Sequence, residues 1–127
     1  MERVNSVVVR GNEAPVEQTP WGSLQWLVGR NMPQYGMTVG RVTFKPGESN
    51  PIHAHPNCDE ILFVVNGEIE HSLPGGGTTR LNPGDCIALD RKQGHRAKNI
   101  GTTEAVVLVM FNSSERQTES AAYSAPA

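Results

Sequence analysis

The feature that most limits what this chain can fold into is a series of short apolar runs, each followed by a turn signal. The runs cover residues 4–9, 24–28, 37–44, 61–65, 68–73, 85–89 and 105–111. Asn66-Gly67, between two of these runs, is the dipeptide most typical of a tight β-hairpin. No long window shows a helical stripe with caps. The pattern therefore predicts an all-β sandwich or barrel.

Size and charge exclude several classes of protein. The chain has 127 residues and a formal net charge of −2, which predicts one domain and argues against a nucleic-acid partner. The longest apolar run, residues 105–111, is too short to cross a membrane, so we expect no membrane partner. Residues 113–127 are polar, small and aperiodic. We therefore predict a domain over residues 1–112 and a disordered or loosely docked tail over residues 113–127.

The N-terminus and the cysteines bear on the cellular compartment. The first residues contain no apolar segment of the kind found in signal peptides. Two cysteines, Cys58 and Cys86, are too few for a disulfide framework. Both observations favour a cytoplasmic protein with free thiols, while a secreted mature form stays open. We expect Cys86 to pack inside a buried strand.

Three of the four histidines and one glutamate have the spacing of a metal site. His53 and His55 are separated by one residue, so on a strand both imidazoles point to the same face. Glu60 opens the next apolar strand, and His95 follows a later strand and a tight turn at Gln93-Gly94. Three imidazoles and one carboxylate suit a transition metal, whereas Ca and Mg prefer oxygen ligands. A site of the three histidines alone, with Glu60 beside it, would suit copper.

The same residues carry a resemblance to the cupin family. The first cupin motif is matched at every fixed position and the second at its glycine, histidine and asparagine, by Gly47, His53, His55, Glu60 and Gly67 and by Gly84, His95 and Asn99. Asp90 and Lys92 stand where the family has Pro and Gly, so we expect Gly94 to supply the turn instead.

The resemblance implies a fold, a ligand set and an assembly. The fold is a single cupin jelly-roll β-barrel with one divalent transition metal inside, held by His53, His55, Glu60 and His95. Iron, manganese or copper is preferred, and zinc or nickel is compatible with the same ligands. The family also implies a homodimer, formed through a sheet face or by exchange of N-terminal strands, for which residues 4–9 are apolar enough.

Further residues are candidates for contact with a substrate. His71 alternates with Ile69 and Leu73 and so faces the interior, either as a hydrogen-bonded core histidine or as a catalytic, substrate-binding cavity residue that moves a proton. Asn50, three residues before His53, corresponds to a substrate-contacting position in metal-dependent cupins, or is simply a turn residue. Trp21 and Trp26 predict either hydrophobic cover or a sugar-binding lip.

These residues support three hypotheses about function. The first is a mononuclear metal-dependent oxidoreductase, of dioxygenase or oxidative-cleavage type, acting on a small oxygenated or carbohydrate-like substrate. The second is a non-redox isomerase, lyase or hydrolase acting on a sugar acid or a polyketide-type substrate. The third is a metal-dependent module that binds a small molecule without turnover. Fold alone does not choose among them.

Overall fold

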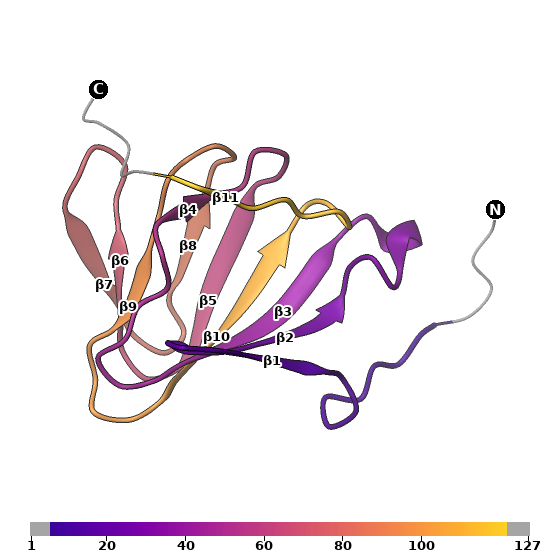
Figure 1. Cartoon of the computed structure of the whole chain (residues 1–127), viewed down its shortest axis with the longest axis horizontal. Coiled ribbons are helices and arrows are strands. Elements are labelled where there is room, and N and C mark those ends of the chain that lie inside the picture. Colours follow the sequence, from indigo (N-terminus) through magenta and orange to yellow (C-terminus); the bar gives the residue numbers. More distant parts are fainter. Residues whose placement is uncertain (1–5, 122–127) are drawn as a thin grey trace.

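The structure, a computed structural model, describes residues 6–121, and its elements are nearly all strands (Figure 1). The strands are β1 Val16–Thr19, β2 Gly22–Val28, β3 Thr38–Phe44, β4 His53–Ala54, β5 Glu60–Asn66, β6 Ile69–Ser72, β7 Thr78–Leu81, β8 Cys86–Leu89, β9 Ala97–Asn99, β10 Ala105–Phe111 and β11 Glu119–Ser120. A short 3₁₀ turn, η1 Pro33–Tyr35, is the single helical element among the described residues. The all-β prediction is confirmed.

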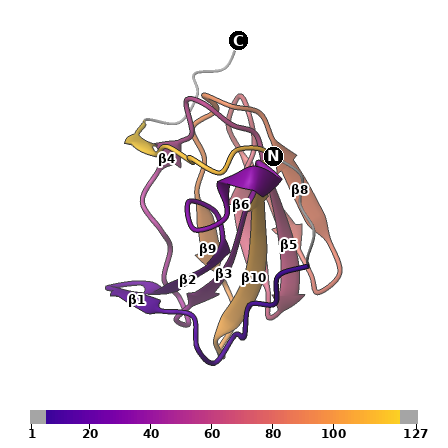
Figure 2. The same ribbon diagram turned by 90° about the vertical axis from the view of Figure 1, so that its right-hand side faces the viewer.

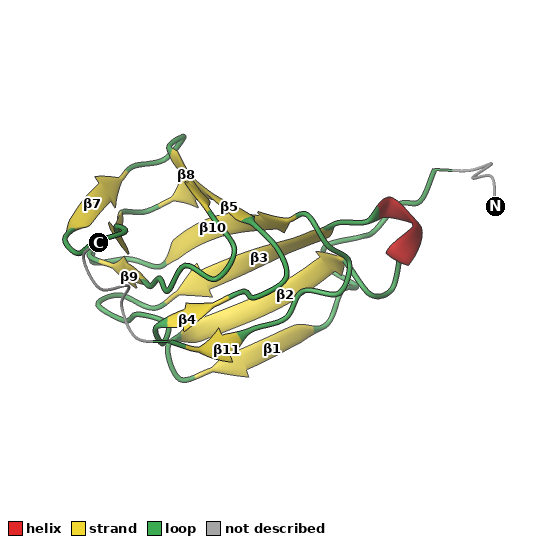
Figure 3. Ribbon diagram, turned by 90° about the horizontal axis from the view of Figure 1, so that it is seen from above, coloured by secondary structure: helices red, strands yellow, loops and turns green. Residues whose placement is uncertain are grey.

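Three antiparallel sheets build the fold. The largest has the strand order β1-β2-β3-β10-β5-β8, the second has the order β7-β6-β9, and β11 pairs with β4. Seen from above, the strands of the largest sheet lie side by side, from β1 and β2 through β3, β10 and β5 to β8 (Figure 3). The short β4–β11 pair lies at the upper end of the molecule in both side views (Figures 1 and 2).

Strand alternation places one row of side chains in the interior. On β10 every second residue from Ala105 to Phe111 is buried, and the residues between them are half-buried. The buried rows continue on β3 and β5, which pair with β10 on its two sides. Ile69 of β6 and Ala97 of β9 join the same core from the second sheet. The two larger sheets therefore share one apolar core.

The predicted strands with strong alternation are all present. Runs 24–28, 37–44, 61–65, 68–73, 85–89 and 105–111 correspond to β2, β3, β5, β6, β8 and β10. Gly67 makes the predicted turn between β5 and β6 with a φ of 87°. The strand expected over residues 4–9 is wrong for its described part, because residues 6–9 form no strand; residues 4–5 lie outside the described range.

The turn before His95 differs from the prediction. Lys92, not Gly94, adopts the left-handed conformation there, with a φ of 69°. Its N–H donates to the carbonyl oxygen of His55 at 2.8 Å, and this hydrogen bond holds the turn against the upper end of the fold. The turn therefore keeps its backbone shape although a lysine stands where the cupin motif has glycine.

The two cysteines have different surroundings. Both are free thiols, as expected. Cys58 is buried in the core cluster, whereas Cys86 is exposed, so the prediction that Cys86 packs in the interior is wrong. The reason is the alternation of β8, where Ile87 packs on the core and Leu89 is buried, so that Cys86 points outward.

The segment after β10 has defined contacts as far as residue 121. We call residues 113–121 the C-terminal segment. Its strand β11 pairs with β4, and the side-chain amide of Asn57 donates to the carbonyl oxygen of Glu115 at 2.8 Å. Residues 122–127, the rest of the predicted tail, lie outside the described range. The boundary at residue 112 stays a prediction.

Candidate metal centre

The four residues singled out by the motif spacing meet at one point near β4 and the start of β5. Each offers one ligand atom, and the ligand atoms of His53, His55, Glu60 and His95 all lie within 4.8 Å of one another. The backbones of His53 and His95 pair directly, with N–H donations to the partner's carbonyl oxygen at 3.1 and 2.8 Å. This pairing brings β4 and the segment around His95, which are far apart in the sequence, side by side.

Backbone carbonyls fix the orientation of the three imidazole rings. His53 Nδ1 lies 2.7 Å from the carbonyl oxygen of Pro51, and His95 Nδ1 lies 2.9 Å from that of Gln93. His55 Nδ1 lies 2.9 Å from the carbonyl oxygen of Gln117, in the C-terminal segment. Because a carbonyl oxygen only accepts, each Nδ1 carries a proton, and in the neutral ring the lone pair is on Nε2. That tautomer is the one in which Nε2 binds a metal ion.

Glu60 sits at the centre of the group. Its Oε1 lies 3.1 Å from Nε2 of both His55 and His95. These are hydrogen-bond distances, yet Oε1 and both Nε2 atoms are buried without a well-directed hydrogen bond. Buried polar groups are nearly always paired, so atoms that converge in this way fit a bound cation. The donor set of nitrogen and one carboxylate suits a divalent transition metal.

The electrostatics favour the metal-binding forms of Glu60 and His53, whereas contact with Glu60 outweighs burial and raises the pKa of His95. Burial opposes the charge of Glu60, but the contacts from His55 and His95 outweigh burial and lower its pKa to about 2. Burial, followed by the neighbouring His95, lowers the pKa of His53 to about 4. At neutral pH Glu60 is therefore a carboxylate and His53 a neutral imidazole, the forms that ligate a metal.

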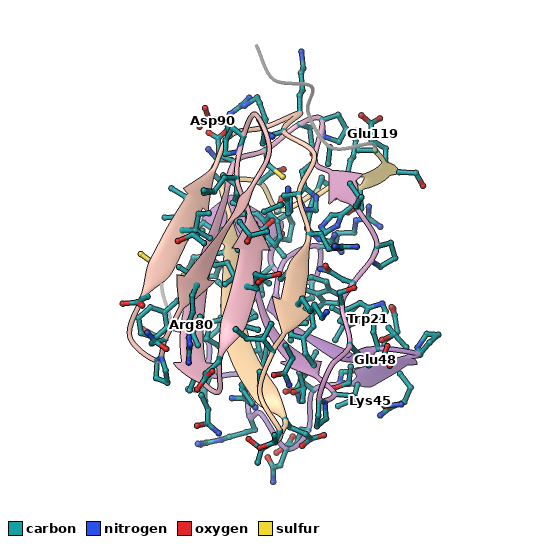
Figure 4. The ribbon with its side chains drawn as sticks, turned by 90° about the vertical axis from the view of Figure 1, so that its left-hand side faces the viewer. Trp21, Lys45, Glu48, Arg80, Asp90 and Glu119 are labelled. Atoms are coloured by element: carbon teal, nitrogen blue, oxygen red, sulfur yellow. The ribbon has the colours of Figure 1, made fainter. Side chains whose placement is uncertain are left out.

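The ligand group lines a cavity of about 330 Å³. Its walls are largely apolar, and they include Trp21, Trp26, Phe44 and Phe111. Trp21 packs on Phe44 with 5.2 Å between ring centroids, so the tryptophans both cover the core and line the cavity. Glu119 and Trp21 both line the cavity, and in Figure 4 Trp21 lies below Glu119. The cavity volume of about 330 Å³ lies at the lower end of the range for small-molecule sites, about 300–1,000 Å³.

Comparison with known sequences identifies the family. The sequence model described as Cupin domain matches residues 40–111, more than half of the chain. The chain belongs to the cupin family. The matched region contains the whole ligand group, from His53 to His95.

The relatives of this cupin include plant proteins of greater length. Oxalate oxidase 1 from Hordeum vulgare is 38% identical over 85 residues, which cover 61% of this chain and 42% of that protein. Germin-like protein 3-3 from Oryza sativa subsp. japonica is 33% identical over 85 residues, covering 61% and 37%. A solved structure of oxalate oxidase matches with a TM-score of 0.75 and 26% identity, covering 86% of this chain and 60% of the other. This cupin thus spans about two fifths of the length of these two relatives.

Two further predicted residues of this cupin lie on the same cavity. His71 is fully buried, and its Nδ1 lies 2.8 Å from the carbonyl oxygen of Ser72, so its Nε2 keeps a lone pair and has no partner. Its ring stacks on that of His95 at 5.8 Å between centroids. Asn50 accepts a hydrogen bond from the Ala97 N–H at 3.0 Å, which leaves its side-chain nitrogen for a ligand.

The C-terminal segment contributes to this cupin's cavity, which was not predicted from the sequence. Arg116 and Thr118 line the cavity, and Gln117 supplies the carbonyl oxygen that orients His55. The composition of this segment, polar and without periodicity, gives no sign that it returns over the ligand group. The two-residue pairing of β11 with β4 is a long-range contact that only the folded chain displays.

In the part of this cupin that the structure describes, no helix is long and apolar enough to span a membrane.

Proposed function

We propose that this cupin is a mononuclear metal-dependent oxidoreductase that acts on a small oxygenated organic acid. The observation that carries the proposal is the convergence of three imidazole Nε2 lone pairs and one ionised carboxylate on a single point of a largely apolar cavity. The relatives named oxalate oxidase support redox chemistry and an acid as substrate. A carbohydrate-like substrate is the second class to test.

In this proposal His53, His55, Glu60 and His95 hold one divalent ion, with manganese, iron or copper preferred. When bound, such an ion supplies Lewis-acid and redox chemistry at positions that four protein ligands leave open. The protein supplies ring orientation through the three backbone carbonyls and excludes water with the aromatic walls. Asn50 offers its side-chain nitrogen to a substrate oxygen.

His71 has the properties of a proton carrier in the same cavity. Burial lowers its pKa, so the ring is neutral at pH 7 and its free Nε2 can accept a proton. We propose His71 as the catalytic residue that takes a proton from the substrate. The same feature favours the second candidate function, a non-redox isomerase or lyase, because such reactions require a base and tolerate zinc or nickel.

The test begins with metal content. Protein purified without added metal is analysed by plasma mass spectrometry beside a His53→Ala, His55→Ala double variant and a His71→Gln variant. We expect about one equivalent of manganese, iron or copper in the wild type and in His71→Gln, and none in the double variant. Absence of metal in the wild type, even after reconstitution, contradicts the proposal.

Turnover separates the two candidate functions. An oxygen electrode records dioxygen consumption with oxalate, glycolate and a panel of sugar acids. Substrate-dependent consumption by the wild type, lost in the double variant and reduced at least tenfold in His71→Gln, is the result we expect. Full conversion of a substrate by zinc-loaded protein without dioxygen uptake favours the isomerase or lyase instead.

The proposal also covers the barrel, the domain boundary, the oligomeric state and the cellular compartment. We propose that the sheets form the jelly-roll barrel of the family, that residues 1–112 make one domain, and that the protein is a cytoplasmic homodimer. The shared core of the two larger sheets supports the barrel. Exposed apolar residues on the outer face of β5 support the dimer, and the free thiols support the compartment.

A further inference from the structure

Arg116 stands in the wall of the cavity, in the C-terminal segment between β10 and β11. Its guanidinium carbon lies 4.2 Å from the centroid of the Trp26 ring and 5.4 Å from that of Phe111. Stacking of this kind holds a guanidinium plane against an aromatic face. Gly40 makes room for the Trp26 ring, because a Cβ atom there would lie 2.5 Å from two of its ring carbons.

The charge of Arg116 has no carboxylate partner among the described residues. Arg30, Arg80 and Arg91, by contrast, each pair with a carboxylate at an exposed position. Burial lowers the pKa of Arg116, and the acid that most opposes this effect is Glu60 of the ligand group. The other acid on the cavity wall, Glu119, is exposed and forms no ion pair with Arg116. A partly desolvated guanidinium without a counterion is a ready site for an anion.

Arg116 is also joined to the ligand group. Its Nη1 donates to Thr118 Oγ1, and the same oxygen lies 3.2 Å from His55 Nδ1. Thr118 therefore links the guanidinium of Arg116 to His55, one of the residues that hold the metal in the proposed function. Arg116 and Trp26 also line a second cavity, of about 400 Å³. Both residues therefore border the metal-site cavity and this second cavity.

The size and polarity of the cavity walls indicate which kind of molecule bears the anionic group. The cavity of about 330 Å³ would hold roughly ten water molecules at about 30 Å³ each, more space than a two-carbon diacid fills. Trp26 and Phe111, beside the guanidinium, offer apolar faces rather than further hydrogen-bond donors. The site thus combines one cation with an apolar compartment.

We propose that Arg116 binds the carboxylate of a substrate whose body is apolar and larger than oxalate, such as an aromatic or branched monocarboxylic acid. The inference rests on the proposed function, since it names the substrate class of the same cavity. Arg116 is then a specificity-determining residue: it selects an anionic headgroup, and the aromatic wall selects the apolar body.

The experiment compares benzoate with benzamide, a neutral ligand of nearly the same shape. Binding to the full chain as purified is measured by titration calorimetry and by tryptophan fluorescence, and metal content is determined on the same samples. We expect wild-type protein to bind benzoate about tenfold or more tightly than benzamide. Arg116→Met, which keeps an unbranched side chain on Trp26, should abolish the preference, and Arg116→Lys should keep part of it.

A charge-matched control is Arg80→Gln, since Arg80 pairs with Glu68 on an exposed edge and does not line the cavity. This variant should bind both ligands as the wild type does. Equal affinity for the two ligands in the wild type, no binding of benzoate, or a preference that survives in Arg116→Met overturns the inference. If the protein holds about one equivalent of metal but binds benzoate and benzamide equally, the inference about Arg116 fails and the proposed function stands. An Arg116-dependent preference in metal-free protein supports the inference while the proposed function fails.

Discussion

At the scale of single residues, the ligand group depends on backbone carbonyls as much as on its own side chains. His53 and His95 each bond to the carbonyl oxygen two residues earlier, so their ring orientations are set locally. His55 differs, because its Nδ1 lies against Gln117, 62 residues away. Two ring orientations are therefore built into short turns, and the third requires the C-terminal segment to be in place.

Lys92 gives a test of local backbone strain. It is the single non-glycine residue with positive φ in the described range, at 69°, a region that costs a residue with a Cβ atom about 1 kcal/mol or more. Lys92→Gly relieves that cost, partly offset by the greater freedom of glycine in the unfolded chain. We expect the free energy of unfolding to rise by about 0.5–1 kcal/mol in urea titrations. Lys45→Gly, at an exposed position without positive φ, should lower it; a loss of stability in Lys92→Gly contradicts the argument.

The convergence of the four candidate ligand residues was predictable from the sequence, and the other half of the cavity was not. His53 and His55 have the two-residue spacing of one strand face, and the family motif adds Glu60 and His95. Arg116 belongs to no motif, and its segment has no hydrophobic period. Its place depends on a long-range pairing of two residues, and sequence periodicity contains no such information.

At the scale of elements, the strands that were predicted from the sequence include the central strands of the large sheet, each of which has one buried face. β3, β5 and β10 are central strands with strict alternation, and all three were found. β1 and β7 are edge strands of polar composition, so their sequences differ little from loops. β4 and β11 have two residues each, too short to show any period.

Asn57 ties the C-terminal segment to the ligand group, and its removal should weaken metal binding. Its side chain donates to the carbonyl oxygen of Glu115 at 2.8 Å and accepts from the N–H of Gln117 at 3.0 Å. Asn57→Ala frees Gln117, whose carbonyl oxygen orients His55. Loss of such outer contacts typically costs about 10–100-fold in metal affinity, and we expect about tenfold here by chelator competition. Asn31→Ala, at an exposed site away from the ligands, should have no effect; unchanged affinity in Asn57→Ala contradicts the role of the segment.

Asp59 joins the start of β5 to the turn after β8. The stability that this junction contributes should depend on pH. Its carboxylate accepts hydrogen bonds from Arg91 and Asn112, which lower its pKa to about 2. Because the folded pKa lies below the ordinary 3.8, the stabilisation is complete above about pH 4 and is lost as the pH falls through about 2. Asp59→Asn should therefore lower the urea midpoint at pH 6, and the difference should shrink towards pH 2.

The control for this prediction is Glu104→Gln, an exposed carboxylate without an ion pair in the described range. It should leave the midpoint unchanged at every pH. A difference between wild type and Asp59→Asn that stays constant from pH 6 to pH 2 would show that the effect is not due to the charge of Asp59.

At the scale of the whole molecule, the outer face of the six-stranded sheet carries exposed apolar side chains. Ile61 and Val65 of β5 are 44% and 46% exposed. Ile61 lies opposite Met110, and Phe63 lies opposite Leu108, so the apolar row extends across β5 and β10. β5 lies between β10 and β8, and its backbone is therefore already paired. What remains for a partner is the side-chain face, and contiguous apolar surface of this kind marks an interaction site.

A second copy of the chain is the partner that the proposed dimer requires, and the outer face of β5 is where it should bind. Of the two dimer modes that the family implies, the sheet face is favoured by its exposed apolar side chains. We expect light scattering at tens of micromolar to give the mass of a dimer, and an Ile61→Lys, Val65→Lys double variant to give a monomer, because two buried charges oppose association. Val16→Lys, at an exposed valine of β1, should remain dimeric. A monomeric wild type, or a double variant that still dimerises, excludes this face as the interface.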